Sequence, residues 1–447
     1  MTAEATAARP PLPSFREALR FWAWLGCVSF GGPAGQIAIM HRELVERRRW
    51  ISERRFLHAL NYCMVLPGPE AQQLATYLGW LMHRTWGGVV AGALFVLPSL
   101  VVLIALSWAY VAHDSVPLVA AVFAGVKPVV VAIVAHAAWR IGARALRHPL
   151  HWALAVAAFV ALYAFAVPFP AIVLAAAAIG AAGGRLVPSA FGPAGHAGSD
   201  AQPHAAAAID DDTAPPPHAR HSWAHAARVI GACAALWLAG YAVATRLDGG
   251  GDTLQSMARF FTQAAFVTFG GAYAVLPYVH QAAVEAHGWL TSSQMIDGLA
   301  LGETTPGPLI MIVAFVGYVG AWTKAALGPD ALALAGVAGA CVATFFTFLP
   351  SFLFILVGGP LVESTRGSLR WTAPLSGVTA AVVGVIANLA LFFALHVLVP
   401  AGSVNAQALL IALGAAAALF GGKVGVISVI AAGAATGIGA AAVRGLL

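Results

Sequence analysis

Long apolar runs dominate this chain and set the kind of fold that it can adopt. They occupy residues 88–112, 116–139, 152–167, 172–182, 229–244, 331–357, 380–399, 406–420 and 424–443. A transmembrane helix needs about 20 mostly apolar residues. Only 9% of the residues are charged, against about 25% in soluble domains, so too few polar residues remain to coat a large soluble core. The sequence predicts an all-α polytopic membrane protein, a multi-pass protein of the cell membrane (the inner membrane in a bacterium).

The charge pattern argues against a nucleic-acid-binding protein, although the net charge is +6. The arginines form short clusters between apolar runs, which is typical of the cytoplasmic loops of membrane proteins. The N-terminal tail, residues 1–14, contains no apolar stretch like that of a cleaved signal peptide. We therefore expect insertion through the protein's own helices. The four cysteines stand singly without metal-ligand spacing, so neither a metal nor a cofactor is expected.

An internal duplication relates the two ends of the chain. Phe30-Gly31-Gly32 recurs as Phe269-Gly270-Gly271, and Pro67-Gly68-Pro69 recurs as Pro306-Gly307-Pro308, both at an offset of 239 residues. Leu97-Pro98-Ser99 recurs as Leu349-Pro350-Ser351 at an offset of 252 residues. Several matches in the same order at shared offsets indicate two homologous halves.

The duplication divides the chain into two domains, residues 15–187 and residues 254–447. Between them, residues 188–227 are rich in Pro, Gly, Ala, His and Asp, a composition that predicts a flexible cytoplasmic linker. The histidines of this linker could bind a metal, but they show no fixed ligand spacing, which favours a solvated tether. An extra apolar segment, residues 228–245, predicts a transmembrane helix that bridges the two halves.

The two halves differ sharply in the charge of equivalent loops. Residues 41–55 carry six Arg and three Glu, whereas residues 280–294 carry no Lys or Arg and one Glu. Because loops rich in Arg stay in the cytoplasm, the equivalent loops are expected on opposite sides of the membrane. The extra helix at residues 228–245 supplies the odd crossing. The sequence therefore predicts inverted topology, which is typical of secondary transporters whose substrate site lies near the middle of the membrane.

The repeated glycine and proline motifs interrupt two apolar segments in the first half. Proline removes a backbone donor and glycine frees the backbone, so residues 19–40 and 56–82 are not expected to form continuous helices. A full crossing by residues 56–82 would place Arg140, Arg144 and Arg147 outside, against the charge rule. We therefore predict broken or re-entrant helices at these motifs, with kinked ordinary spans as the alternative.

Broken helices at membrane depth are tolerated where they are buried in protein or line a polar cavity. Their free N–H groups and positive dipole ends suit an anion, and a tetrahedral oxyanion accepts hydrogen bonds on every side. The nearby side chains that we expect to contribute to binding are Gln36, Gln72, Tyr273, Thr304 and Thr305. Glu70 and Glu303 are candidates for proton coupling or gating, because ionisable residues in a membrane are costly and default to functional roles. A structural carboxylate is the alternative for each.

Lys127 stands inside an apolar run, in the sequence Ala124-Gly125-Val126-Lys127-Pro128. It is a candidate for the fixed positive charge of an anion site. The alternatives are that it snorkels to the interface or pairs with a carboxylate. Its repeat mate is Thr379, so this charge is not symmetric.

These motifs resemble those of the chromate ion transporter (CHR) family. The resemblance rests on FGGPAGQ at residues 30–36 and PGPEAQQLATYLG at residues 67–79, with FGGAYAVLPY at residues 269–278 and GETTPGP at residues 302–308. It matches the long, two-domain form of the family, whose halves are antiparallel. The family's motif positions correspond here to Gly31, Gly32, Pro33, Pro67, Gly68, Pro69, Gly270, Gly271, Pro306, Gly307 and Pro308. Ala272 replaces the proline that follows the first FGG motif, so the halves need not contribute equally.

The resemblance implies a secondary transporter that exports chromate from the cytoplasm, driven by the membrane potential and with proton coupling left open. The expected partners are a small inorganic oxyanion (chromate, with sulfate as its analogue) and the lipid bilayer; a homodimer is left open and no nucleic acid is expected. A transporter of sulfate or another small anion is the main alternative. A membrane-embedded enzyme is disfavoured, because the apolar runs contain no acidic cluster or metal-binding motif.

Overall fold

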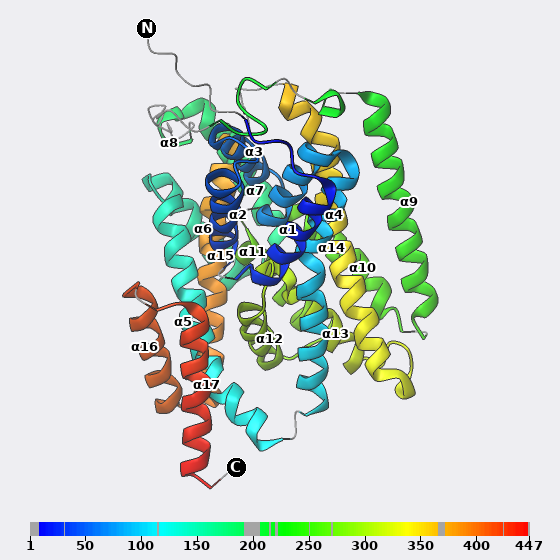
Figure 1. Ribbon diagram of the computed structural model, residues 1–447. Helices are drawn as coiled ribbons and strands as arrows, with labels where there is room; N and C mark the ends of the chain where they lie inside the picture. The colour runs from blue at the N-terminus through cyan, green and yellow to red at the C-terminus, as the bar shows by residue number, and fades with distance from the viewer. Residues whose placement is uncertain are drawn as a thin grey trace.

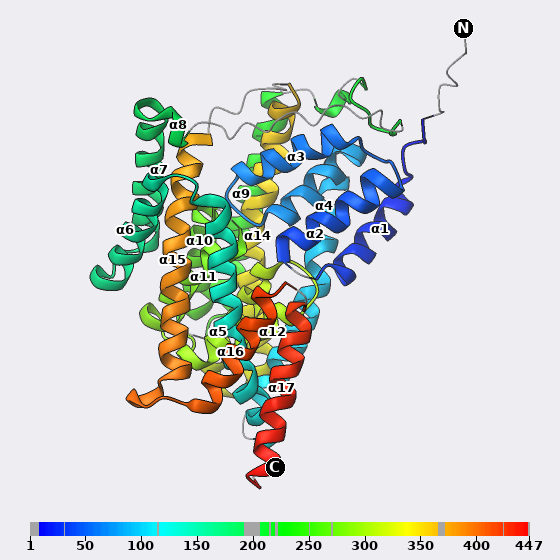
Figure 2. The ribbon, with the colours of Figure 1, turned by 90° about the vertical axis from the view of Figure 1, so that its left-hand side faces the viewer.

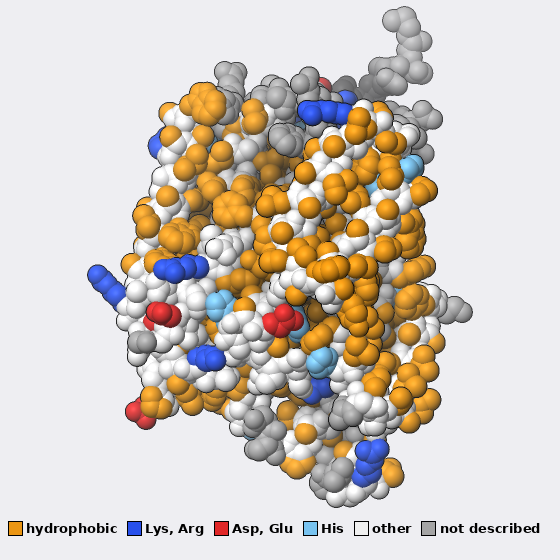
Figure 3. All heavy atoms as spheres, turned by 180° about the vertical axis from the view of Figure 1, so that it is seen from behind, with side chains coloured by type: hydrophobic (Ala, Val, Ile, Leu, Met, Phe, Trp, Pro, Cys, Tyr) orange, Lys and Arg blue, Asp and Glu red, His pale blue; other side chains and the backbone are white. Residues whose placement is uncertain are grey.

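The computed structural model describes residues 9–30, 32–113, 116–191, 206–213, 216–219, 222–249, 251–269, 271–364, 372–422 and 424–445. Apart from one isolated bridge between Ile51 and Ile209, the regular structure in this part of the chain is helical. Within the described residues, seven helices are long and apolar enough to cross a membrane. Hydrophobic side chains cover most of the face shown in Figure 3, and charged side chains appear on it at only a few places. The prediction of an all-α polytopic membrane protein is confirmed.

The first half contains α1 (Phe15–Val28), α2 (Gly32–His41), α3 (Glu53–Val65), α4 (Glu70–Ala112), α5 (Pro117–Ala145), α6 (Pro149–Phe165) and α7 (Phe169–Leu186). The short α8 (Pro188–Phe191) and the long α9 (Trp223–Leu247) connect it to the second half. The second half contains α10 (Thr253–Val267), α11 (Ala272–His280), α12 (Ser292–Thr304), α13 (Ile312–Thr323), α14 (Leu332–Ser364), α15 (Thr372–Leu398), α16 (Ala406–Phe420) and α17 (Val426–Val443).

The duplication reaches the details of local structure. A π-helical turn follows α2 (η1, Arg42–Arg47), and another follows α11 (η3, Gln281–Ala286), exactly 239 residues later. Ser52 caps α3 by accepting a hydrogen bond from the backbone N–H of Arg55 at 3.3 Å, and Thr291 caps α12 by accepting from that of Gln294 at 3.2 Å. A short hydroxyl side chain satisfies one of the free N–H groups at a helix start. Equivalent sequence signals therefore start equivalent helices.

The helices of the first half that carry the glycine and proline motifs are re-entrant. α4 contains two residues with non-helical dihedral angles, His83 and Arg84, which divide it into residues 70–82 and residues 85–112. These two legs lie side by side in opposite directions, because a Cβ atom on Gly79 would stand 2.4 Å from the carbonyl oxygen of Gly87. Residues 53–82 thus enter the membrane as α3, break at Pro67-Gly68-Pro69 and return to the same side. The prediction of a re-entrant segment is confirmed.

The second half repeats this arrangement upside down. A Cβ atom on Gly317 of α13 would stand 2.2 Å from the carbonyl oxygen of Gly339 of α14, so these helices form the corresponding close hairpin. Figure 1 shows α9 running from the end of the molecule that carries the N-terminus to the opposite end, where α10 begins. The long helices α4 and α14 pack against each other in opposite directions, with Gly88 beside Leu356 and Gly92 beside Phe352. α9 is therefore the odd crossing that inverts the second half.

The Arg-rich residues 41–55 lie at the end of the molecule that also carries the N-terminus and the linker (Figure 2). By the positive-inside rule we expect this end to face the cytoplasm, and we call it the cytoplasmic end. The first-half hairpins α1–α2 and α3–α4 enter from this end, and the second-half hairpins α10–α11 and α12–α13 enter from the other (Figure 1). Their tips consequently meet inside the membrane.

Part of the linker is docked on this cytoplasmic end. The backbone N–H of Ile209 donates to the carbonyl oxygen of Trp50 at 3.0 Å, and that of Ser52 donates to the carbonyl oxygen of Ile209 at 3.0 Å. The Ile209 side chain is buried in the core that includes Leu44, Trp50 and Ile51. The composition of residues 188–227 predicts a flexible linker, and that stays a prediction; around Ile209 the chain is docked, because this one isoleucine adds to the core. Residues 192–205, 214, 215, 220 and 221 of the linker lie outside the described residues.

The inverted topology makes a direct prediction about sidedness. Arg47 and Ala286 are exposed at equivalent positions of the two halves. In a variant whose four native cysteines are replaced, a cysteine at position 47 should react with a membrane-impermeant thiol reagent only from the cytoplasmic side. A cysteine at position 286 should react only from the outside. Labelling of both positions in intact cells would contradict the inverted arrangement.

Candidate functional site

The tips of the four broken helices hold one another by an exchange of backbone hydrogen bonds. The N–H of Gly68, between α3 and α4, donates to the carbonyl oxygen of Thr268, between α10 and α11, at 2.7 Å. The N–H of Gly307, after α12, donates to the carbonyl oxygen of Ser29, between α1 and α2, also at 2.7 Å. The offset of 239 residues relates Gly68 to Gly307 and Ser29 to Thr268. The two bonds are thus one contact repeated by the internal symmetry, and each joins the two halves.

Glycine is required at both proline-flanked tips. Gly68 and Gly307 have φ angles of +123° and +106°, which L side chains rarely adopt. A Cβ atom on Gly68 would also stand 2.6 Å from the hydroxyl of Ser351, and one on Gly307 would stand 2.6 Å from the Cβ of Ser99. Ser99 and Ser351 belong to the repeated Leu-Pro-Ser motif. The long helices α4 and α14 therefore press these serines against the tips.

Buried polar atoms without a partner gather at this meeting point. The side chains of Ser29, Ser99 and Ser351 are at most 1% exposed, and their hydroxyl oxygens have no hydrogen-bond partner among the described residues. The side-chain oxygens of Gln36, Gln72 and Gln73 are likewise buried and unpartnered in this part of the chain. Because buried polar groups are nearly always hydrogen-bonded, the hydroxyls are available to donate to a bound acceptor. Sequence reasoning found the Leu-Pro-Ser repeat but did not assign its serines to the site.

The predicted binding side chains divide into two groups. Gln36 holds a tip directly: its amide nitrogen donates to the carbonyl oxygen of Gly307 at 2.5 Å. Gln72 donates to Thr76 at 3.0 Å within α4, and its side-chain oxygen is buried without a partner among the described residues. Thr304 and Thr305 instead donate to carbonyl oxygens of their own helix, those of Leu301 at 2.9 Å and Gly302 at 3.1 Å. These two hydroxyls are occupied in closing the end of α12.

The motif prolines and glycines lie where the sequence predicts breaks. Pro33 stands in the first turn of α2, and Gly271 precedes α11 with a φ angle of +91°. Pro67 and Pro69 flank one tip, Pro306 and Pro308 flank another, and Gly32 has a φ angle of +71°. Gly31 and Gly270 lie outside the described residues.

Both candidate carboxylates approach the same break, the one before α11. The Tyr273 hydroxyl donates to Glu303, and a carboxylate oxygen of Glu70 lies 3.8 Å from the position that a Cβ atom on Gly271 would take. Their repeat mates are Met64 and Leu309, so these charges are not symmetric. The backbone of the site is therefore symmetric, whereas its acidic groups belong to one side.

One arginine accompanies this acidic side. Arg140, on α5, lies close enough to Glu303 and to Tyr273 to interact with both electrostatically. It is half-buried, and the ion pairs formed among the described residues do not include it. From the sequence, Arg140 was interpreted as a cytoplasmic marker and, with His136 one turn before it, as an interfacial cap, because its spacing in α5 does not reveal how far the side chain reaches.

Lys127 has its charge compensated elsewhere. Its ammonium group lies 3.4 Å from the Asp297 carboxylate and donates to the Ser293 hydroxyl at 2.6 Å. Asp297 precedes Thr304, the last residue of α12, by seven residues, which is about 10 Å of helix. Of the alternatives left open by the sequence, the structure shows pairing with a carboxylate.

Other features of the described residues do not add a metal site. No group of three or more His, Cys, Asp or Glu side chains in this part of the chain could hold a metal ion. A cavity of about 580 Å³ lies apart from the tips, between α10, α11 and the α6–α7 turn, and is lined by Arg259, Gln263, Tyr278, Gln281 and neighbouring residues. The chemistry that the tips offer is therefore hydrogen-bond donation from hydroxyl groups, beside one asymmetric cluster of charge.

Comparison with known proteins agrees with this architecture. The family described as "Chromate transporter" matches residues 16–181 and again residues 255–438. The chain is 34% identical to the "Chromate transport protein" of Pseudomonas aeruginosa over 391 residues, covering 86% of this chain and 82% of that protein. It is 30% identical to the "Chromate transport protein" of Cupriavidus metallidurans over 386 residues, covering 86% and 84%.

A "Probable chromate transport protein" of Synechococcus elongatus is 30% identical over 382 residues, covering 85% of this chain and 84% of that protein. No solved structure shows a significant match. The family match spans both halves, and its interruption falls on the linker and α9. A duplicated membrane protein with this match over most of its length is a transporter, and this chain belongs to the chromate transporter family.

Proposed function

We propose that this protein is a secondary transporter that exports chromate from the cytoplasm and binds the dianion where the four helix tips meet. The observation that carries the proposal is that buried hydroxyls without a partner among the described residues lie at both proline-flanked tips, Ser351 at Gly68 and Ser29 with Ser99 at Gly307. Chromate is tetrahedral and accepts hydrogen bonds in several directions, so donors from both halves suit it. Chromate as the substrate is supported by the relatives in Pseudomonas aeruginosa and Cupriavidus metallidurans, which are named chromate transport proteins.

The charge of the anion needs a compensating cation, and we assign that role to Arg140. Lys127, the candidate from the sequence, is already paired with Asp297. Arg140 lies near Glu303 and Tyr273 at the break before α11, and its planar guanidinium can donate two parallel hydrogen bonds to an oxyanion. Glu303 and Glu70 repel an anion when they are ionised. Protonation of Glu303 on binding would therefore couple proton movement to anion occupancy, with Tyr273 and Arg140 as its neighbours.

The membrane potential favours export. Moving one charge through 100 mV is worth about 2.3 kcal/mol, so a dianion gains about 4.6 kcal/mol on leaving a cytoplasm that is negative by 100 mV. Because about 1.4 kcal/mol corresponds to a factor of ten, this potential alone sustains a gradient of roughly a thousandfold. Export then needs no nucleotide hydrolysis, and the sequence contains no GxxxxGK[ST] loop for it.

The proposal is tested by flux into everted membrane vesicles, whose outer surface is the cytoplasmic face. A potential that is positive in the lumen should drive chromate uptake, and vesicles without the protein should show none. Sulfate uptake and sulfate competition are measured in parallel, with a pH gradient imposed on the parent and on Glu303→Gln. Uptake of sulfate without chromate would reassign the substrate. A flux that ignores the potential would remove the proposed driving force.

The glycine tips should be intolerant of a side chain. Gly68→Ala and Gly307→Ala each place a Cβ atom against the serine of the opposite half and force an unfavourable φ angle. We expect chromate flux to fall by roughly tenfold or more, since small displacements of binding groups can cost about a hundredfold, while the protein still inserts. Gly439→Ala, which meets no atom within 4 Å, is the control. Normal flux in both tip variants would show that the tips do not form the site.

Replacing Arg140 should weaken substrate binding. Arg140→Gln removes a charged hydrogen-bond donor, worth about 1.5–3 kcal/mol, so the KM for chromate should rise by roughly tenfold to a hundredfold. Arg140→Lys should restore part of the affinity. Arg144→Gln, one turn further along α5 and exposed, should leave the KM unchanged. An unchanged KM in Arg140→Gln would exclude Arg140 from the site.

A further inference from the structure

Two clusters of the same kind, each built on a buried carboxylate, tie the halves together at opposite ends of the membrane. Among the described residues, each cluster brings together a carboxylate, a cation and a tyrosine, and each joins a re-entrant helix of one half to a long helix of the other. They stand on either side of the helix tips. Neither cluster forms part of the proposed anion site.

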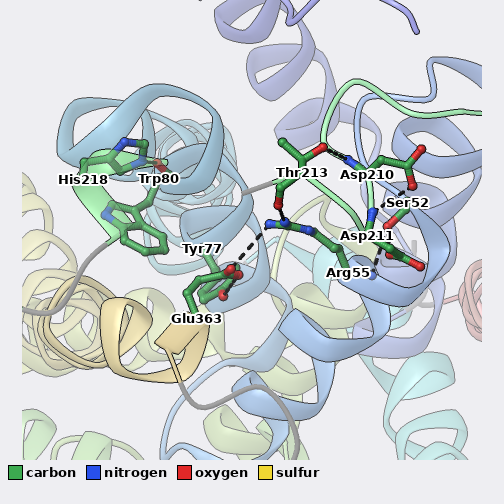
Figure 4. A network of polar contacts seen from close by, with 9 residues as sticks. All are labelled: Ser52, Arg55, Tyr77, Trp80, Asp210, Asp211, Thr213, His218 and Glu363. Carbon is green, nitrogen blue, oxygen red and sulfur yellow. Dashed lines mark hydrogen bonds and ion pairs between the residues drawn. The ribbon is translucent and has the colours of Figure 1, made fainter. Parts of the chain in front are cut away.

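The cytoplasmic cluster is centred on Glu363, near the end of α14 (Figure 4). Its carboxylate lies 3.4 Å from the guanidinium of Arg55, in the first turn of α3, and accepts a hydrogen bond from the Tyr77 hydroxyl at 2.6 Å. The side chains of Arg55 and Glu363 are 6% and 4% exposed. Glu363 belongs to the second half, whereas Arg55 and Tyr77 belong to the first.

The outer cluster is centred on Asp297, in the second turn of α12. Its carboxylate lies 3.4 Å from the ammonium of Lys127 on α5 and accepts a hydrogen bond from the Tyr110 hydroxyl, near the end of α4, at 2.9 Å. The Asp297 side chain is 3% exposed, whereas that of Lys127 is 28% exposed, so this pair lies nearer to solvent than Arg55–Glu363. Here the carboxylate comes from the re-entrant helix of the second half, and both partners come from the first half.

The two clusters occupy equivalent places, although their charged residues are not repeat mates. α3 and α12 are equivalent re-entrant helices, and the last turns of α14 and α4 are equivalent ends of long helices. Tyr110 corresponds to Val362, the neighbour of Glu363. By contrast, Arg55 corresponds to Gln294, Glu363 to Val111, Asp297 to His58 and Lys127 to Thr379. The duplication therefore explains why the two clusters lie at equivalent positions. It does not explain their charged residues, because these are not repeat mates.

An ion pair between two moving bodies has a property that an apolar contact lacks. Buried and dry, the two charges need each other, and loss of one partner is strongly destabilising. When the two halves separate and water enters, both charged side chains are hydrated. The open state therefore leaves no charged group without a partner. Alternating access in inverted-repeat transporters requires the halves to part on one side at a time. A contact of this type can be broken and remade in every cycle.

We propose that Arg55–Glu363 is the cytoplasmic gate and Lys127–Asp297 is the outer gate, which open alternately on the helix tips. The inference rests on the proposed transport cycle. Arg55 also donates a hydrogen bond to the carbonyl oxygen of Thr213 in the docked linker. Ser52, three residues before Arg55, donates to Asp211 at 2.6 Å. The cytoplasmic gate is thus covered by the linker, as Figure 4 shows.

The test measures access to the tips and does not depend on chromate. In a variant without the native cysteines, Ser29→Cys reports on the tip, where the parent side chain is fully buried. Arg55→Gln or Glu363→Gln should raise labelling by an impermeant thiol reagent from the cytoplasmic side by severalfold, and not from outside. Lys127→Gln or Asp297→Asn should do the reverse. Arg54→Gln and Lys324→Gln, exposed at the same two ends, should change neither.

Charge-swapped pairs guard against variants that fail to insert. Arg55→Glu with Glu363→Arg, and Lys127→Asp with Asp297→Lys, keep each cluster paired and should return labelling toward the parent level. Increased labelling from one fixed side whichever gate is altered would overturn the inference. So would unchanged labelling in inserted single variants, which is the outcome expected of a merely structural pair.

Cross-linking supplies a second measurement. Cysteines at positions 55 and 363, or at 127 and 297, are joined by a short methanethiosulfonate cross-linker, and the reductant then releases them. Either cross-link should abolish chromate flux reversibly if both gates must open in each cycle. Flux that persists through a complete cross-link would overturn the assignment of that pair. If the parent protein showed no chromate flux while the gate variants still changed the labelling, the result would contradict chromate as the substrate. The assignment of the two gates would be unaffected.

Discussion

The exchange of two backbone hydrogen bonds between helix tips is the contact on which the rest of this structure depends. Gly68 donates to Thr268, and Gly307 donates to Ser29. Helices that stop inside a membrane leave polar backbone groups without partners, which is costly in an apolar solvent. Each broken helix satisfies part of this need with a broken helix of the other half. The re-entrant hairpins, the inversion by α9 and the convergence of serines at the centre all serve to bring these ends together.

The backbone features of the two halves are repeated, whereas the charged residues of the site are not. The π-helical turns after α2 and α11, the caps at Ser52 and Thr291, and the serines of the Leu-Pro-Ser motifs all repeat. Glu70, Glu303 and Arg140 do not, and they stand together near the start of α11. Because the backbone is repeated in inverted orientation, the site can open toward either side of the membrane by the same kind of movement. The charged side chains are not repeated, so the groups available to the substrate differ between the two halves.

The sequence was sufficient for the architecture and insufficient for the partners of individual side chains. Glycine and proline act through the local backbone, so Pro67-Gly68-Pro69 and its repeat revealed the breaks directly, and the arginines of residues 41–55 revealed the orientation. Lys127 and Arg140 were harder, because a partner such as Asp297 lies 170 residues away and nothing in the local pattern announces it. Ile209 likewise gave no signal in a polar linker. Contacts set by packing between distant helices need the folded structure.

The crossed pairing of the tips has a consequence for each half taken alone. A polypeptide corresponding to one half alone would insert with its Ser29 and Gly68, or their mates, facing no complementary backbone. It would be completed by a second copy inserted in the opposite orientation. In this chain α9 joins one copy of each orientation, so every molecule contains both, and their charged residues are free to differ.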